Sequence, residues 1–282
     1  MKRFACLPLA VLLAVVLGQG LAATAAPAAD PVAMELFKQY KAVGPLPLAS
    51  QTVKDLDEAK AYKIQAGLAD LYKIHGAKVS GYKAGLTSKP AQDKFKASGP
   101  VSGVLFDSML ITDGVARVKG HGLMMLEVEI AFELKQDVTQ PVDAKAMPGL
   151  VAKVMPAVEV PDLKFTDMKA LTVADIVASN VGARAYLLGK PVSPEGVDVN
   201  AVTGQLLRDG QAVGQAAPGR AALGDQWQAL AWTVNNALKH GQPVKAGMVL
   251  LTGSLGPMYP AQPGAHQAVY TGGLGELSFK VE

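Results

Sequence analysis

Cysteine is almost absent from this chain of 282 residues, because its one example is Cys6. Cys6 lies in an N-terminal stretch that we expect to be removed, and it comes too early to accept a lipid anchor. The mature protein is therefore expected to have no disulfide, no thiol nucleophile and no thiolate metal site. Any metal ion must be bound by carboxylate oxygens or imidazole nitrogens.

Long apolar runs are also missing after the N-terminus. The basic pair Lys2 and Arg3 precedes an apolar segment from Leu7 to Leu17, and Ala23-Thr24-Ala25 matches the small-residue pattern of a cleavage site. The apolar segment is short for a membrane span. We therefore expect residues 1–25 to be a signal peptide and the mature protein to be periplasmic or secreted, without stable membrane association. An uncleaved N-terminal anchor is the alternative.

An excess of charge of one sign is lacking as well. The chain has 27 lysines and arginines against 24 aspartates and glutamates, so removing the two basic residues of the leader leaves 25 against 24. This balance is not typical of a protein that binds nucleic acid. Histidine is scarce too, and we expect His75, His121, His240 and His266 to take no part in metal binding. The expected partner is a small molecule.

The pattern of predicted elements favours an α+β fold with a mixed or antiparallel sheet, since strands outnumber helices after residue 100 and do not alternate with them. We expect one domain over residues 26–282, with a helical segment at about 30–78 and a β-rich core at 79–282. Helices are expected over 32–42, 55–75, 90–96, 172–180 and 225–241, and strands over 78–83, 101–106, up to 134, 185–188, 201–207, 248–252, 267–270 and 277–281.

Three local expectations depend on particular residues. Asp55-Leu-Asp-Glu58 resembles a capping box, which predicts Asp55 at the start of the second helix. Asp209-Gly210 predicts a hairpin turn. Residues 151–160 change character midway, so that a helical start and a strand after Pro156 are expected.

One segment, from Leu126 to Leu134, alternates strictly between apolar and other residues, which indicates a β-strand with two different faces. Glu127 and Glu129 share a face and lie about 7 Å apart along the strand. If their carboxylates converge, one must take a proton or both must share a cation. The alternative is an ordinary solvated face. Glu133 continues that face, and we expect it to be solvated or to play a supporting part.

Four segments stand out by their order and spacing: GYKAGLTS (Gly81–Ser88), EVEIAF (Glu127–Phe132), MPAVEVPD (Met155–Asp162) and LTGSLGPM (Leu251–Met258). Together they resemble the 2-keto-4-pentenoate hydratase branch of the fumarylacetoacetate hydrolase superfamily. The resemblance runs from about residue 34 to the end, with weaker matches at Asp55–Gln65 and Gly272–Ser278. It implies a fumarylacetoacetase-type β-sheet roll with flanking helices.

The resemblance implies that Glu127, Glu129 and Glu159 hold one divalent cation, Mg²⁺ or Mn²⁺. The residue chemistry agrees, because Glu159 stands among apolar neighbours and converging carboxylates favour a hard cation. Asp162 and Lys164 occupy the acid and base positions of the family and are candidates for a supporting role.

The resemblance also assigns Lys83 as the catalytic lysine. Its neighbours Tyr82, Ala84 and Gly85 favour partial desolvation, which is expected to lower the lysine pKa; a surface lysine is the alternative. The residues from Thr252 to Gly256 form a small-residue loop after a predicted strand. Such loops can bind carboxylates through their amides and hydroxyls, and an ordinary turn is the alternative. The substrate-binding residues implied are Thr252, Gly253, Ser254, Leu255 and Asn180.

The activity implied is addition of water to a 2-hydroxy-2,4-dienoate, giving a 4-hydroxy-2-oxo acid, by a homo-oligomer. The sequence departs from the family at Pro100–Gly103, where hydratases carry an active-site aspartate, and 2-oxo-3-enedioate decarboxylases also lack that aspartate. Arg184 adds a cation that could meet a second substrate carboxylate. The alternatives are such a decarboxylase, an acylpyruvate hydrolase, or an exported non-catalytic binder of 2-oxo acids or metal.

Overall fold

The computed structural model describes Met1 and residues 30–282. The predicted signal peptide, apart from Met1, lies outside the described residues, so it stays a prediction. Within the described part of the chain, every helix is too short or too polar to cross a membrane.

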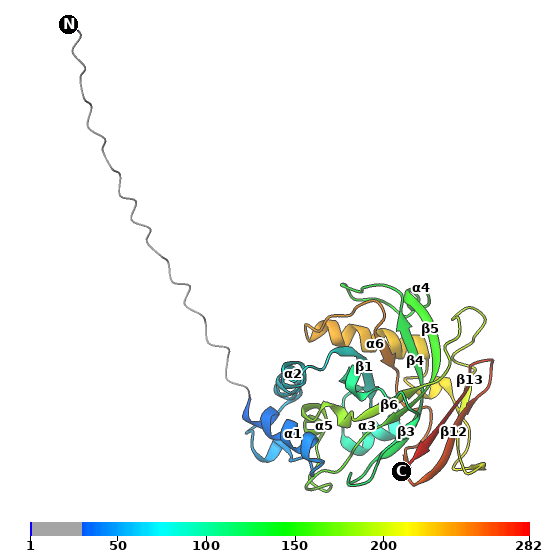
Figure 1. Cartoon of the computed structure of the whole chain (residues 1–282), viewed down its shortest axis with the longest axis horizontal. Helices are drawn as coiled ribbons and strands as arrows, with labels where there is room; N and C mark the ends of the chain where they lie inside the picture. The colour runs from blue at the N-terminus through cyan, green and yellow to red at the C-terminus, as the bar shows by residue number, and fades with distance from the viewer. Residues whose placement is uncertain (2–29) are drawn as a thin grey trace.

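Three helices pack together on one side of the molecule: α1 (Pro31–Ala42), α2 (Glu58–Ile74) and α5 (Val173–Ala178) (Figure 1). The N-cap of α2 is Asp57, whose carboxylate accepts a hydrogen bond from the Lys60 amide at 2.8 Å. The prediction of Asp55 as this cap is wrong. Asp55 has a left-handed backbone with φ of 52°, whereas Asp57 has the extended backbone that an N-cap requires.

The first sheet carries seven strands and is mixed. Its order is β2-β1-β10-β4-β5-β6, with β11 paired to β4. β1 and β10 are parallel, and the other pairs are antiparallel. The strands are β1 (Val79–Gly85), β2 (Val101–Phe106), β4 (Met125–Leu134), β5 (Val151–Val160), β6 (Ala185–Leu188), β10 (Val249–Leu251) and β11 (Tyr259–Pro260).

The second sheet has the order β3-β13-β12-β7-β8, with β9 paired to β7. The predicted hairpin at Asp209-Gly210 is confirmed: both residues have positive φ, and Arg208 pairs with Gln211 across the turn. The strands are β3 (Val115–Ala116), β7 (Thr203–Arg208), β8 (Gln211–Ala212), β9 (Ala217–Pro218), β12 (Gly264–Tyr270) and β13 (Gly275–Val281).

Two apolar clusters hold these layers together. The larger one includes side chains from both sheets and from α6 (Gln226–Lys239), and the smaller one lies among α1, α2 and α5. The α+β prediction with a mixed sheet is confirmed. The remaining elements are α3 (Lys89–Phe95), α4 (Met147–Leu150) and the short 3₁₀ turns Ala49–Gln51, Asp107–Met109, Asn180–Gly182 and Gly219–Ala221.

β5 corrects one prediction, because residues 151–160 form a continuous strand with no helical start. Proline lacks the N–H that a central strand donates. The register between β5 and β6 ends at Ala157 opposite Leu188, so Pro156 lies where β6 has already ended. Its carbonyl still accepts a hydrogen bond from Gly189, at 2.8 Å. Pairing with β4 along nearly its whole length outweighs the local sequence signal.

Candidate active site

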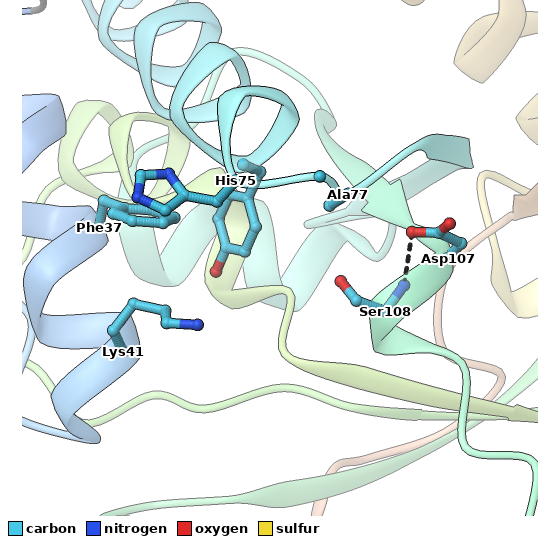
Figure 2. A pocket seen from close by; sticks show the side chains of 8 residues that line it. Phe37, Lys41, His75, Ala77, Asp107 and Ser108 are labelled. Carbon is cyan, nitrogen blue, oxygen red and sulfur yellow. Dashed lines mark hydrogen bonds between the residues drawn. The ribbon is translucent and has the colours of Figure 1, made fainter.

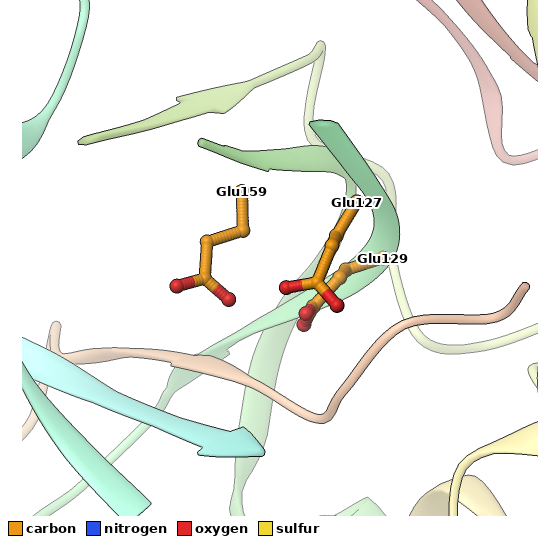
Figure 3. A group of neighbouring side chains, drawn as sticks. All are labelled: Glu127, Glu129 and Glu159. Carbon is orange, nitrogen blue, oxygen red and sulfur yellow. The ribbon is translucent and has the colours of Figure 1, made fainter. Parts of the chain in front are cut away.

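Three glutamates meet on one face of the first sheet. The antiparallel register sets Glu127 of β4 directly opposite Glu159 of β5, and Glu129 follows two residues later on the same face. Carboxylate oxygens of the three residues all lie within 4.8 Å of one another, and Figure 3 shows them converging. Glu129 and Glu159 are fully buried, and Glu127 is partly buried. The solvated-face alternative is therefore wrong for this stretch.

The hydrogen-bond donors around these carboxylates leave some carboxylate oxygens without a partner. Glu129 Oε2 accepts a hydrogen bond from the Gly253 amide at 2.9 Å. Glu129 Oε1 and Glu159 Oε2 are buried without a hydrogen-bond partner in the described part of the chain. Buried carboxylate oxygens are costly to leave unpaired. The set of ligands thus fits a hard divalent cation, which takes oxygen ligands and cancels negative charge.

Lys83 enters the same space from β1. It is in register with Leu251 of β10, which is in register with Ala131 of β4, so Lys83 shares the face of the glutamates. Its Nζ lies 2.9 Å from Glu159 Oε1 and donates a hydrogen bond to the Val181 carbonyl at 3.1 Å. The side chain is 3% exposed, so the surface-lysine alternative is wrong.

The glutamates reverse the expected pKa shift of Lys83. Burial lowers the pKa of Lys83. The nearby carboxylates of Glu159, Glu127 and Glu129 together raise this pKa by more than burial lowers it, so the net shift is upward. The predicted lowering is therefore wrong, because the sequence showed the apolar neighbours of Lys83 but not the charges that the fold brings to it. Lys83 is a cation held among carboxylates.

The three carboxyl groups shift in the direction expected for crowded, buried acids. Burial and repulsion from Glu159 raise the pKa of Glu127 to about 7. The same two causes, with Glu127 added, hold the pKa of Glu129 well above its usual range. Burial raises the pKa of Glu159, and Lys83 opposes this shift. Ionising all three acids beside one ammonium leaves two negative charges uncompensated, so protons or a divalent cation must balance them.

The loop after β10 supports the glutamates through its first residues and adds later residues to the cavity lining. Gly253 has φ of 104°, and a Cβ on it would lie 2.3 Å from the Thr87 hydroxyl, so only glycine brings this amide to Glu129. Thr252 and Leu255 are buried, and Thr252 Oγ1 donates a hydrogen bond to the Gln226 side chain at 2.6 Å. Of the four predicted loop residues, Ser254 lines the cavity beside the glutamates.

Asn180 has structural contacts in place of the predicted substrate contact. Its side chain accepts from the Val104 amide at 2.6 Å and donates to the Val104 carbonyl at 2.8 Å. Asn180 and Val181 both have left-handed backbones, with φ of 58° and 55°. By fixing this turn to β2, Asn180 positions the Val181 carbonyl that Lys83 contacts.

Four other charged candidates point elsewhere. Asp162 accepts from the backbone amides of Leu123 and Lys164, and it lies 3.4 Å from His121. Arg184 was expected to meet a second substrate carboxylate. It donates a hydrogen bond to the Tyr40 carbonyl at 2.7 Å and does not line the cavity. Lys164 also lies away from the cavity lining. Glu133 pairs with Lys153 across the strands at 2.8 Å.

A cavity of about 240 Å³ opens above the site and is lined by Lys83, Glu127 and Ser254 among others. Val101, in the stretch where hydratases carry an aspartate, pairs with Gly85 and so shares the face of Lys83. It is fully buried beside Val181. An apolar side chain therefore stands where the family pattern puts an acid.

A larger cavity of about 450 Å³ lies apart from the glutamates (Figure 2). It is lined by Phe37, Lys41, His75 and Asp107, and by none of the predicted site residues. The Asp107 carboxylate already accepts backbone hydrogen bonds from Lys78 and Ser108. Asp107 thus serves the local fold, and we assign this cavity no chemistry.

Sequence reasoning missed three residues that build the site. The Tyr270 hydroxyl, from the second sheet, lies 2.8 Å from the Glu129 carbonyl and 2.7 Å from the Ala157 carbonyl, so it ties β4 and β5 together at the glutamates. Gln226 fixes the loop through Thr252. Thr87 packs against Gly253 and lines the cavity. Thr87 lies within one of the matching segments, while Tyr270 and Gln226 carry no local sequence signal.

Comparison with known proteins identifies relatives of this chain. No family model matches the chain. The 2-hydroxyhexa-2,4-dienoate hydratase of Comamonas testosteroni is 36% identical over 225 residues, covering 78% of this chain and 84% of that protein. The 2-keto-4-pentenoate hydratase of Paraburkholderia xenovorans (strain LB400) is 30% identical over 259 residues, covering 90% and 94%.

Among solved structures, the 4-oxalocrotonate decarboxylase from Pseudomonas putida G7, complexed with magnesium and adipate, matches with a TM-score of 0.83. It is 24% identical, and the match covers 89% of this chain and 96% of that one. The fold is that of the fumarylacetoacetate hydrolase superfamily. Within that superfamily, the chain belongs to the 2-keto-4-pentenoate hydratase family and is a hydratase-like enzyme.

Proposed function

We propose that this protein adds water to a 2-hydroxy-2,4-dienoate and releases a 4-hydroxy-2-oxo acid. The observation that carries the proposal is the buried set of Glu127, Glu129 and Glu159 with Lys83 Nζ 2.9 Å from Glu159, opening into a cavity. The names of the relatives support the substrate class, since they are hydratases of 2-hydroxyhexa-2,4-dienoate and of 2-keto-4-pentenoate.

Glu127, Glu129 and Glu159 would hold Mg²⁺ or Mn²⁺. The unpaired oxygens Glu129 Oε1 and Glu159 Oε2 and the excess negative charge support this, as does magnesium in the related decarboxylase structure. When bound, the cation supplies a Lewis acid for the oxygens of a 2-oxo acid.

The residues of the chain itself then move the protons. Lys83 is the cationic donor at the cavity wall, and the Val181 carbonyl and Glu159 fix its Nζ. We infer that Lys83 gives its proton to the carbon skeleton and then recovers one from the enol hydroxyl, while water adds across the remaining carbon–carbon double bond. The product differs from the substrate by one water molecule.

The direct test is the loss of diene absorbance when the protein is mixed with 2-hydroxypenta-2,4-dienoate and Mg²⁺. The proposal expects a magnesium-dependent loss that EDTA abolishes. Val101, in place of an acid, makes a decarboxylase the alternative. Steady absorbance with every dienoate, together with CO₂ release from a 2-oxo-3-enedioate, would replace the hydratase with that enzyme. Binding without turnover of either would indicate a non-catalytic binder.

A further inference from the structure

The cavity above the glutamates has two chemically different walls. One carries Lys83, Glu127 and Ser254. The other is apolar and is formed by residues after β1, in α3, after β5 and in α5. Its side chains belong to the smaller apolar cluster or pack against it, so the fold fixes their positions. They are Leu86, Phe95, Leu163, Phe165, Leu171 and Ile176.

Two methionines extend the apolar wall to the surface. Met168 and Met258 line the cavity and are 47% and 40% exposed. When a ligand covers exposed apolar side chains at a cavity mouth, the burial of their surface stabilises the complex. Methionine also adapts its shape to irregular apolar groups.

Cations are scarce on the apolar side. Among the described residues that line the cavity, Lys94 is the one basic side chain besides Lys83. Lys94 is exposed, and its Nζ lies 5.3 Å from the centre of the Phe95 ring. Arg184, as described above, donates to the Tyr40 carbonyl. A carboxylate at this end of a ligand would thus lose water without a fixed partner, which is unfavourable.

Resting on the function proposed above, we propose that the site selects dienoates whose far end carries an apolar alkyl or aryl group, and that it discriminates against a second carboxylate there. The acid-lined wall takes the 2-oxo acid end. Phe95, Phe165, Met168 and Met258 bury the substituent and set the specificity.

Binding of saturated 2-oxo acids tests this without turnover. Calorimetry of the full-length protein with Mg²⁺ would compare 2-oxobutanoate, 2-oxopentanoate, 2-oxohexanoate and 2-oxoadipate. Affinity is expected to rise about fourfold with each methylene, the factor that corresponds to about 0.8 kcal/mol. 2-Oxoadipate should bind at least about tenfold more weakly than 2-oxohexanoate, which has the same chain length.

The outcomes separate the two proposals. If 2-oxoadipate binds as tightly as 2-oxohexanoate or more tightly, the apolar specificity is overturned while the hydratase proposal stands. If none of the acids binds in the presence of Mg²⁺, the proposed function fails and the specificity fails with it.

Variants then locate the effect. Met168→Ser should weaken 2-oxohexanoate about fourfold or more and leave 2-oxobutanoate unchanged. Met34→Ser is the matched control, because Met34 is 51% exposed on α1, away from the cavity. Lys94→Met should leave the affinity for 2-oxoadipate as low as in the parent. A loss of 2-oxoadipate binding in Lys94→Met, or equal effects of the two serine variants, would contradict the proposal.

Discussion

At the scale of single residues, the charge on Lys83 depends on its neighbours more than on its burial. The side chain is almost fully buried, yet the surrounding carboxylates hold it in the protonated form. A buried ion pair that loses one partner leaves an uncompensated charge. Lys83 is therefore tied to both the chemistry and the stability of the site.

Lys83→Met should lower turnover of the dienoate by about 100-fold or more. In protein treated with EDTA it should also lower the free energy of unfolding by about 3 kcal/mol, because Glu159 loses its partner. Steady-state kinetics and urea unfolding measure the two effects. Lys89→Met, at an exposed lysine on α3, is the control and should change neither. Turnover of the Lys83 variant within tenfold of the parent would remove its catalytic role.

Glu127 gives the site a pH dependence with a definite sign. Its folded-state pKa of about 7 lies above the ordinary glutamate value of 4.5, so between these pH values the folded protein holds a proton that the unfolded chain has released. Stability must then fall as the pH rises between these values. For EDTA-treated protein we expect Glu127 alone to contribute a loss of roughly 1 to 2 kcal/mol between pH 5 and 7, after allowing for partial exposure of its carboxyl group.

Urea unfolding at several pH values measures this slope. Glu127→Gln should make the slope shallower, leaving the part that comes from Glu129 and Glu159. Excess Mg²⁺ should flatten the slope in the parent, because the cation would replace the protons. A parent protein whose stability rises steadily from pH 5 to 7, with the same slope in the variant, would count against the crowded-carboxylate account.

At the scale of elements, the site depends on the loop after β10 as much as on the strands. Gly253→Ala must place a Cβ against Thr87 in a backbone region that disfavours side chains. We expect a loss of about 3 kcal/mol in the free energy of unfolding, and weaker Mg²⁺ binding because the amide that contacts Glu129 moves.

Gly247→Ala is the matched control. Gly247 also has positive φ, but a Cβ there would meet nothing within 4 Å. It should lose only about 1 kcal/mol, from backbone strain, and keep the affinity for Mg²⁺. Equal losses in both variants would show that the contact with Thr87 has no importance.

The elements also show how far the sequence alone reaches. The alternation of residues 126–134 predicts β4 and its acidic face correctly, because the period of a strand is local. The helical start predicted for residues 151–160 fails, since pairing between β4 and β5 outweighs local preference. The approach of Lys83 to Glu159 depends on β10, a strand much later in the chain, and no local spacing contains that information.

Resemblance, rather than pattern, linked the three glutamates to one site. The structure supports that set because the register of β4 and β5 puts Glu127 opposite Glu159. Resemblance was less informative about contacts with the substrate. The structure puts three of the predicted residues behind the cavity wall: Asn180, Thr252 and Leu255. The prediction missed this because a motif identifies which residues matter but not which way their side chains point.

At the scale of the whole molecule, the leader and the assembly state stay predictions. The basic pair, apolar segment and small-residue site of residues 1–25 predict export and a mature chain that begins near Ala26. N-terminal sequencing of protein isolated from the native host checks this. A chain that retains Met1 would contradict cleavage.

The whole molecule should respond to metal through one site. A cation that binds the folded chain and not the unfolded one raises stability by about 2.7 kcal/mol at a hundredfold excess over its dissociation constant. The gain should depend on all three glutamates together, because in the proposed site each would supply oxygen to the same cation. Glu133 lies on the same strand, but it pairs with Lys153, so it serves as an internal control.

The most direct measurement is a calorimetric Mg²⁺ titration of the parent and of four variants: Glu127→Gln, Glu129→Gln, Glu159→Gln and Glu133→Gln. We expect strong loss of affinity in the first three variants and parent-like affinity in Glu133→Gln. We also expect Glu129→Gln to be at least as stable as the parent in EDTA, because a like-charge contact is relieved. Equal Mg²⁺ affinity in all five proteins would contradict the shared cation site and the catalytic proposal built on it.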